Sequence, residues 1–166
     1  SPTNSASFNV SAQFSEAVTG FNLTDITIGN GSASNFISVD TDTFTFDITP
    51  ATDGMVTVDI NASVAQDTAD NSNSAATQFT IIYDTTAPTI ILSTTATNPT
   101  NSSPFNVTAQ FSEPVNGFTI GDITPSNGSA GNFIAVDTDT FTFDITPTTD
   151  GIVTVDINAS VAQDSA

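Results

Sequence analysis

The chain is built from an internal repeat of 97 residues that no insertion interrupts. The stretch SFNVSAQFSEAVTGF from Ser7 returns as PFNVTAQFSEPVNGF from Pro104, and VDTDTFTFDITP starts at Val39 and again at Val136, 97 residues later. Twelve of the thirteen Phe residues form pairs at this spacing, and only Phe79 has no partner. Such self-similarity predicts two copies of one small domain rather than a single large fold.

The boundary between the copies is marked by the segment IIYDTTAPTI, which starts at Ile81 and occurs once. A repeat that runs from one such linker to the next begins near Asp84. We therefore expect two domains, residues 1–83 and 84–166, as part of a longer array. The first would lack its first strand and the second its last. An arbitrary cut through the array explains these gaps as well as a biological one does.

Alternation of apolar and polar residues predicts strands rather than helices. It is clearest in 8–14, 44–48 and 56–64, where Phe, Val and Ile alternate with Asn, Ser, Thr and Asp. Turn-forming runs such as NPTNSSP, SNGS and TDG separate these segments. One copy is expected to contain seven strands, at 89–94, 105–112, 118–124, 132–136, 140–145, 151–161 and, in the first copy, 76–83.

Seven antiparallel strands in about 100 residues predict an all-β fold of tandem immunoglobulin-like seven-stranded β-sandwiches. The chain contains no Cys and no Trp, so neither a disulfide nor a tryptophan can organise the core. The core of each sandwich is therefore expected to consist of Phe, Val and Ile.

The charge balance excludes several classes of partner. The 166 residues include 18 Asp and Glu and no Lys, Arg or His, which gives a formal net charge of −18 at pH 7. Nucleic acids and anionic membrane surfaces are bound through basic side chains, so neither is expected. No apolar run approaches the roughly 20 residues of a membrane-spanning helix. The counter-charge is expected to be a metal cation or a saline medium.

The composition also argues against an enzyme. Nucleophilic catalysis of the Ser-His-Asp or Cys-His kind needs side chains that the chain lacks, and no Lys can serve as a base. A pair of carboxylates is enough for glycoside hydrolysis. However, the chain has no Trp and a single Tyr from which to build a sugar platform, and its carboxylates are expected at turns. We therefore expect no catalytic site.

Several longer motifs resemble a known family. They are FSEPVNGF followed by DIT, then VDTDTFTFDITPTTDGIVTVDI, and then VAQDTADNSNSAATQFTIIYDTTAP. Together they are similar to the tandem bacterial immunoglobulin-like repeats of very large secreted surface proteins, including repetitive adhesins of the biofilm-associated and RTX types. The resemblance covers essentially the whole chain. Where that family often has Ala-Gly-Asn, this chain has Ala69-Asp70-Asn71, which adds one carboxylate.

This resemblance implies an extracellular stalk or spacer at the cell surface. It also implies that calcium often lies at the junctions between domains, and that the partners are neighbouring repeats of the same chain. It identifies no ligand.

Strand directions independently predict that carboxylates converge at the junction. If strands alternate in direction from the linker onward, Glu113 and Asp164 share one pole with Asp84, and Asp53 lies at the facing pole of the preceding copy. Ca²⁺ suits such a site because it takes 6 to 8 oxygen ligands in flexible geometry, whereas metals that prefer thiolate or imidazole find no ligands here. With second candidates near the same loops and the equivalents in the first copy, the expected ligands are Asp53, Asp84, Glu113, Asp164, Asp122, Glu16, Asp67, Asp25 and Asp70.

Other carboxylates have simpler interpretations. Asp40 and Asp42 are typical of turns, where Asp side chains bond to their own backbone. The pattern from Asp40 is not an EF-hand, because the sixth position is Thr45 rather than Gly. Four acidic residues alternate with inward-facing ones and are expected to form a solvated face without a ligand role: Asp47, Asp59, Asp144 and Asp156.

Two functions fit these observations. A stalk needs near-identical repeats, solubility and resistance to proteases, and the absence of Lys and Arg removes every trypsin-type cleavage site. The alternative is a subunit of an extracellular filament. Sandwiches that lack an edge strand can accept a strand from an identical chain, which would then be the partner.

Overall fold

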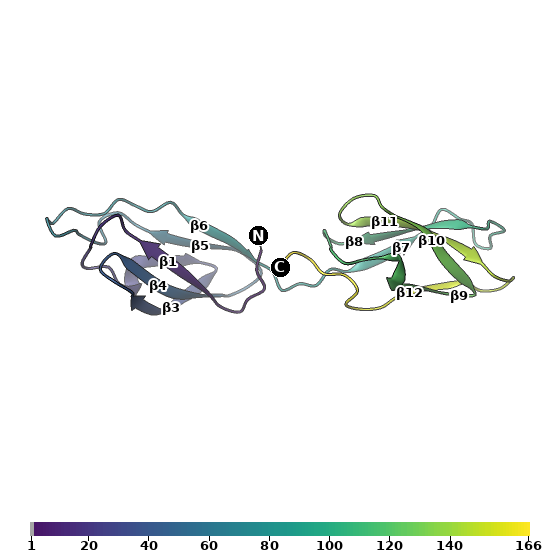
Figure 1. The fold of residues 1–166 in the computed structure, drawn as a ribbon, viewed down its shortest axis with the longest axis horizontal. Helices are drawn as coiled ribbons and strands as arrows, with labels where there is room; N and C mark the ends of the chain where they lie inside the picture. Colours follow the sequence, from purple (N-terminus) through teal and green to yellow (C-terminus); the bar gives the residue numbers. More distant parts are fainter. Residues whose placement is uncertain (1) are drawn as a thin grey trace. The chain divides into compact units, whose positions relative to one another are not determined.

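A computed structural model describes residues 2–166, which form two compact units that divide between Thr86 and Ala87 (Figure 1). Each unit is built of antiparallel strands with one short 3-10 turn. The expected all-β sandwich class is confirmed.

The first unit is a sandwich of two three-stranded sheets. One sheet has the order β1-β4-β3 and the other β2-β5-β6, with a 3-10 turn, η1, ahead of β2. The elements are β1 (Phe8–Gln13), η1 (Leu23–Asp25), β2 (Ile26–Gly29), β3 (Gly31–Ser38), β4 (Thr43–Pro50), β5 (Gly54–Ile60) and β6 (Phe79–Tyr83).

The second unit repeats this plan with a different edge strand. Its larger sheet has the order β10-β11-β8-β7 and its smaller one pairs β12 with β9. Relative to the first unit it gains β7 and has no counterpart of β6 among the residues described. The elements are β7 (Ile90–Ser93), β8 (Phe105–Phe111), η2 (Ile120–Asp122), β9 (Ile123–Ser126), β10 (Gly128–Ala135), β11 (Thr140–Pro147) and β12 (Thr154–Ile157).

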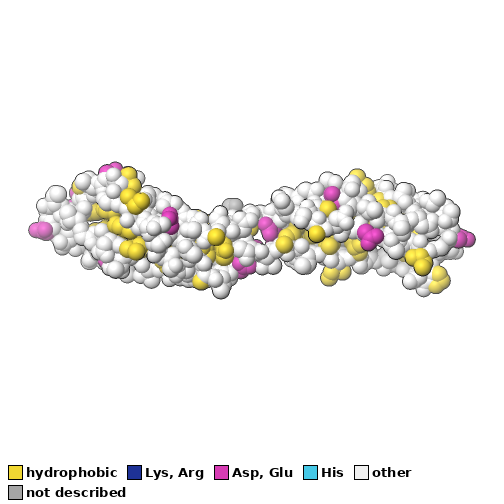
Figure 2. Space-filling view, turned by 90° about the horizontal axis from the view of Figure 1, so that it is seen from below, with side chains coloured by type: hydrophobic (Ala, Val, Ile, Leu, Met, Phe, Trp, Pro, Cys, Tyr) yellow, Lys and Arg dark blue, Asp and Glu magenta, His cyan; other side chains and the backbone are white. Residues whose placement is uncertain are grey.

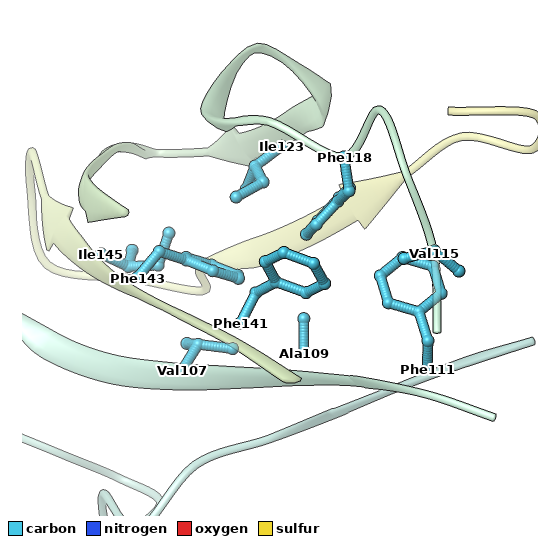
Figure 3. Packing of buried hydrophobic residues seen from close by; sticks show 9 residues of the cluster. All are labelled: Val107, Ala109, Phe111, Val115, Phe118, Ile123, Phe141, Phe143 and Ile145. Atoms are coloured by element: carbon cyan, nitrogen blue, oxygen red, sulfur yellow. The ribbon is translucent and has the colours of Figure 1, made fainter. Parts of the chain in front are cut away.

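The repeated aromatic residues fill both cores in the same way. Phe46 and its equivalent Phe143 are 0% exposed, on the central strands β4 and β11. The rings of Phe118 and Phe141 lie edge to face at 5.1 Å between centroids, within the cluster shown in Figure 3. Edge-to-face packing is a preferred arrangement for aromatic pairs. The alternation read from the sequence therefore identifies the core correctly.

The strand expected at 118–124 begins later than predicted. Thr119 and Asp122 close a capping box around η2, and β9 starts only at Ile123. Asn22 and Asp25 do the same ahead of β2 in the first unit. The prediction was wrong here because capping hydrogen bonds favour a tight turn over the extended chain.

The strand expected at 132–136 begins earlier than predicted, at Gly128. Asn127 alone separates it from β9, with a left-handed φ of 48° that Asn tolerates better than most residues. Its side chain accepts hydrogen bonds from Thr149 N (3.2 Å) and Oγ1 (2.8 Å) and donates to Thr149 O (2.9 Å). One anchored residue thus replaces the predicted loop.

The strand expected at 151–161 is much shorter, covering Thr154–Ile157. In the first unit the equivalent β5 is longer because its opening residues pair with β6, beginning with Gly54 opposite Tyr83. The second unit has no such partner among its described residues. Both strands end well before the predicted limit, since Ser160, like its equivalent in the first unit, adopts a left-handed φ.

Candidate metal centre

Two carboxylates meet at one pole of the second unit. Glu113 follows β8 and Asp164 follows β12, and each offers a carboxylate oxygen within 4.8 Å of the other. The two loops are tied together by reciprocal backbone hydrogen bonds, from Asn116 N to Gln163 O (2.7 Å) and from Gln163 N to Asn116 O (3.0 Å). This ladder, rather than the carboxylates themselves, positions the pair.

The pair places two negative charges close together. Two unit charges at this separation repel each other by about 1 kcal/mol in water and by more where solvent is partly excluded, as it is here. The full sequence has no Lys, Arg or His. Figure 2 accordingly shows carboxylates spread over the surface with no basic side chain among them. A hard divalent cation is the natural counter-charge for two such oxygens.

Asp84 directly follows β6 in the first unit. Its backbone N–H donates to Thr3 O (3.0 Å), and its Oδ1 accepts from Thr86 N (3.0 Å). The side chain is half-buried. These contacts fix the start of the segment that leads into the second unit. They involve the backbone N–H and Oδ1 of Asp84 but not its other carboxylate oxygen, Oδ2.

Asp53, another expected ligand, accepts hydrogen bonds with both of its carboxylate oxygens. Its Oδ1 accepts from Thr85 N (3.1 Å) and Thr85 Oγ1 (2.8 Å), and its Oδ2 accepts from Thr86 Oγ1 (2.7 Å). The Thr86 hydroxyl, followed by that of Thr85, lowers the pKa of Asp53. Asp53 therefore anchors the linker to the turn between β4 and β5 with both of its oxygens.

Asp25 and Asp122 serve as caps of the 3-10 turns. Asp25 Oδ2 accepts from Asn22 N (2.9 Å) and Nδ2 (2.7 Å), and Asp122 Oδ2 accepts from Thr119 N and Oγ1, both at 2.8 Å. The spacing Thr-x-x-Asp at 119–122 is a capping-box signature that could have identified this role from the sequence.

The equivalents in the first unit are divided between loop structure and surface. Asp67 Oδ1 accepts from Ala69 N (2.7 Å) and Asn71 N (2.9 Å), and its Oδ2 accepts from Asn71 Nδ2 (2.8 Å). The Asn71 side chain is the main cause of the lowered pKa of Asp67. Asp70 sits at a left-handed φ of 65°, the conformation that favours Gly, and Glu16 is exposed.

A carboxylate clamp in each unit was missed by the sequence interpretation. Asp47 on β4 accepts from Asn9 Nδ2 of β1 (2.9 Å) and from Asn35 Nδ2 of β3 (2.8 Å), so one side chain joins three strands. Asp144 repeats this with Asn106 (3.1 Å) and Asn132 (2.8 Å). These two carboxylates, expected to be merely solvated, are structural.

The clamp depends on a backbone bulge that only the folded structure reveals. Asn35 has a left-handed φ of 51° at the register shift between Ser34 and Ile37, and this bulge turns its amide toward Asp47. Alternation alone places an Asn at such a position on the solvent face. No spacing in the sequence reveals the bulge.

The clamp predicts an acid-dependent loss of stability. Hydrogen bonds from Asn9 and then Asn35 lower the pKa of Asp47, so its stabilisation is complete above the ordinary Asp value of 3.8 and is lost as the pH falls through the lower folded value. Asp47→Asn should lower the urea midpoint of the first unit at pH 7, and the difference from the parent should shrink below pH 3.8. Fluorescence of Tyr83, the single Tyr, reports on this unit.

Glu16→Gln is the matched control for this experiment. It removes a negative charge from an exposed position of the same unit outside the clamp. Its effect on the midpoint at pH 7 should be smaller. If the difference in urea midpoint between Asp47→Asn and the parent stays constant from pH 7 to pH 2, the proposed role of the clamp is contradicted.

The comparisons with known proteins decide the family. A family model described as the bacterial Ig-like domain matches residues 1–83 and again residues 84–166. The chain belongs to the bacterial Ig-like domain family. A search of curated proteins and a search of solved structures found no match.

As a bacterial Ig-like protein with two tandem copies, the chain confirms the family level of the sequence-based resemblance. Two copies of a bacterial Ig-like domain are a structural repeat whose immediate partners are neighbouring domains of the same chain. No helix within residues 2–166 is long and apolar enough to cross a membrane.

Proposed function

We propose that these bacterial Ig-like repeats are a spacer of an extracellular surface adhesin, in which calcium stiffens the connection between successive repeats. Support for a spacer comes from repetition itself: the two units use the same core and the same clamp, each built from residues 97 positions apart. We assign no catalytic role, since the full chain has no His, Cys or Lys.

The Glu113–Asp164 pair carries the calcium part of this proposal. Backbone hydrogen bonds hold its loops, so the two oxygens are brought together before any ion binds. Calcium accepts carboxylate oxygens at 2.3–2.6 Å and completes its shell with carbonyls and water. Two carboxylates that the fold holds close together are therefore a suitable core for a calcium site.

Asp84 is proposed as the third ligand on the basis of chain length. Thr89 N donates to Ser112 Oγ (3.0 Å), and Ser112 N donates to Thr89 O (2.9 Å), which fixes Thr89 next to the residue that precedes Glu113. Thr89 lies only five positions after Asp84, a span of at most about 18 Å. A calcium ion bound by Glu113, Asp164 and Asp84 would shorten and restrain this tether.

Thermal unfolding tests the calcium part of the proposal. Calcium at 100 times its dissociation constant stabilises the folded state by about 2.7 kcal/mol. For a unit of this size that corresponds to about 10 °C or more in the melting temperature of the second unit. Chelator should lower that temperature, and magnesium should not replace calcium, since Mg²⁺ demands a stricter octahedral geometry.

Glu113→Gln should abolish most of the calcium effect, because it removes one of the paired charges. Glu16→Gln is its control, because it makes the same change at the equivalent residue of the first unit and leaves Glu113 and Asp164 in place. Identical melting in excess chelator and in millimolar calcium would overturn the calcium part and leave the spacer assignment to other tests.

A further inference from the structure

A pocket in the first unit lies where the end of β3 and the start of β4 meet the segment ahead of η1. Its volume is about 510 Å³, within the usual range for ligand sites. Three buried or half-buried rings line its base and three exposed polar residues line its rim: Phe21, Phe36, Phe44, Ser38, Asp40 and Thr41. The pocket thus combines an aromatic base with one carboxylate.

The second unit repeats the residues of this pocket. The rings of Phe36 and Phe44 are stacked at 5.6 Å between centroids, and their counterparts Phe133 and Phe141 are stacked at 5.7 Å. Asp137 is the counterpart of the rim carboxylate and is likewise exposed. The combination of stacked rings and a carboxylate therefore belongs to the repeat rather than to one copy.

Backbone hydrogen bonds hold the carboxylate of Asp40 in place at the rim. Its Oδ1 accepts from Asp42 N (3.0 Å) and from Thr43 N (2.8 Å), as expected for a turn residue. The backbone N–H of Asp42 is the main cause that lowers the pKa of Asp40, so this group is ionised at neutral pH. Neither bond involves the other oxygen, Oδ2. The rim therefore presents a fixed negative charge with an oxygen that can accept a hydrogen bond from a ligand.

The charges around the pocket favour a cationic ligand. Val18 N donates to Thr41 O (2.9 Å), which holds the turn against the segment that contains Glu16. Asp40, Asp42 and Glu16 therefore gather at one end of the unit, and the full sequence has no Lys, Arg or His. The summed field of these charges attracts cations to this end and repels anions.

We propose that this pocket binds the ammonium group of a lysine side chain on a partner protein. The four-carbon stem of the lysine packs against the aromatic base, and the ammonium donates to Oδ2 of Asp40. An aromatic ring also attracts a cation that lies over its face. The 166 residues contain no Lys, so a second copy of them cannot supply this group. The site adds a binding role to the proposed spacer and does not depend on calcium.

Lysine suits this rim better than arginine does. A guanidinium is a planar fork that pairs best with both oxygens of a carboxylate, whereas an ammonium is a compact point charge. One oxygen of Asp40 already accepts two backbone hydrogen bonds, which favours the point charge. A site that recurs in both units also suits a partner with several lysines, because simultaneous binding raises the overall affinity. A free amine gains nothing from this repetition.

Titration of the whole chain, followed by amide NMR signals, tests this site. The probe is Nα-acetyl-lysine methylamide, and chelator is present throughout. We expect the signals of Gly20 and Thr41, which line the pocket, to shift and saturate. Asp40→Asn should weaken this binding at least tenfold, because it removes the charge and keeps an oxygen for the two backbone N–H groups. Unshifted signals in the parent would overturn the proposal.

Glu16→Gln is the matched control for Asp40→Asn. It removes one charge from the same end of the unit at a residue that does not line this pocket, so it should weaken binding far less. Equal losses in the two variants would show attraction to negative charge in general and would contradict the site. Urea unfolding followed by Tyr83 fluorescence checks that each variant is folded during the titration.

Three related probes define the ligand. The norleucine analogue lacks the charge and should not bind, and the arginine analogue should bind more weakly than the lysine probe. Equal binding by either one would contradict recognition of an ammonium. If putrescine, a free diamine, binds more tightly than the lysine probe, the assignment to a partner protein is wrong. Because chelator is present throughout, a negative result here leaves the calcium part of the proposed function intact, and the absence of a calcium effect on melting leaves this site intact.

Discussion

Replacing Phe46 by alanine should lower the free energy of unfolding of the first unit by about 3–5 kcal/mol. Phe46 is 0% exposed on β4, the central strand of its sheet, so the substitution removes a large apolar side chain and leaves a cavity that rigid neighbours cannot fill. The free energy of unfolding of a typical domain is about 5–15 kcal/mol. The unit would therefore lose a large share of its stability, which urea unfolding followed by Tyr83 fluorescence can measure.

Two controls define this effect. Phe79→Ala removes a ring that is 41% exposed and should cost clearly less. Phe143→Ala makes the equivalent change in the second unit and should leave the Tyr83 transition in place while lowering the stability of its own unit. A loss below about 1 kcal/mol for Phe46→Ala would mean that the core is looser than its burial indicates.

The strand core was predictable because its signal is periodic and repeated. Phe44, Phe46 and Ile48 alternate with polar residues in both copies, and all three are buried. Strand ends were less predictable because single hydrogen bonds decide them. Asn127 turns the chain at one left-handed residue, and Asn73 Oδ1, by accepting from Val64 N and Ala65 N, holds a loop where alternation predicts more strand.

For the candidate metal-binding residues, the sequence likewise predicted the position along a strand but not the neighbouring hydrogen-bond donors. Strand direction places Glu113 and Asp164 at one pole, and the structure brings their oxygens within 4.8 Å. Counting carboxylates near that pole also selected Asp53 and Asp122, whose oxygens accept hydrogen bonds from Thr side chains. A sequence shows where an acidic residue lies along a strand, but the donors around it depend on the folded turn.

The absence of native Cys makes stiffness of the linker directly measurable. Ser32 and Ser129 are equivalent exposed positions on β3 and β10, one in each unit. Ser32→Cys with Ser129→Cys gives a chain that carries spin labels only at these two sites. Both sites lie within paired strands, so the width of the label-to-label distance distribution reports chiefly on the segment between the units.

Calcium should narrow this distribution strongly, because a shared ion converts a tether with several rotatable bonds into a restrained one. Glu113→Gln in the labelled chain should keep the distribution broad with or without calcium, and Glu16→Gln should behave like the parent.

Pulsed electron–electron double resonance on the labelled chain, first in chelator and then in millimolar calcium, tests the calcium-stiffened spacer most directly. We predict a broad distribution that becomes narrow with calcium in the parent and stays broad in Glu113→Gln. A distribution of the same width in both solutions would contradict it.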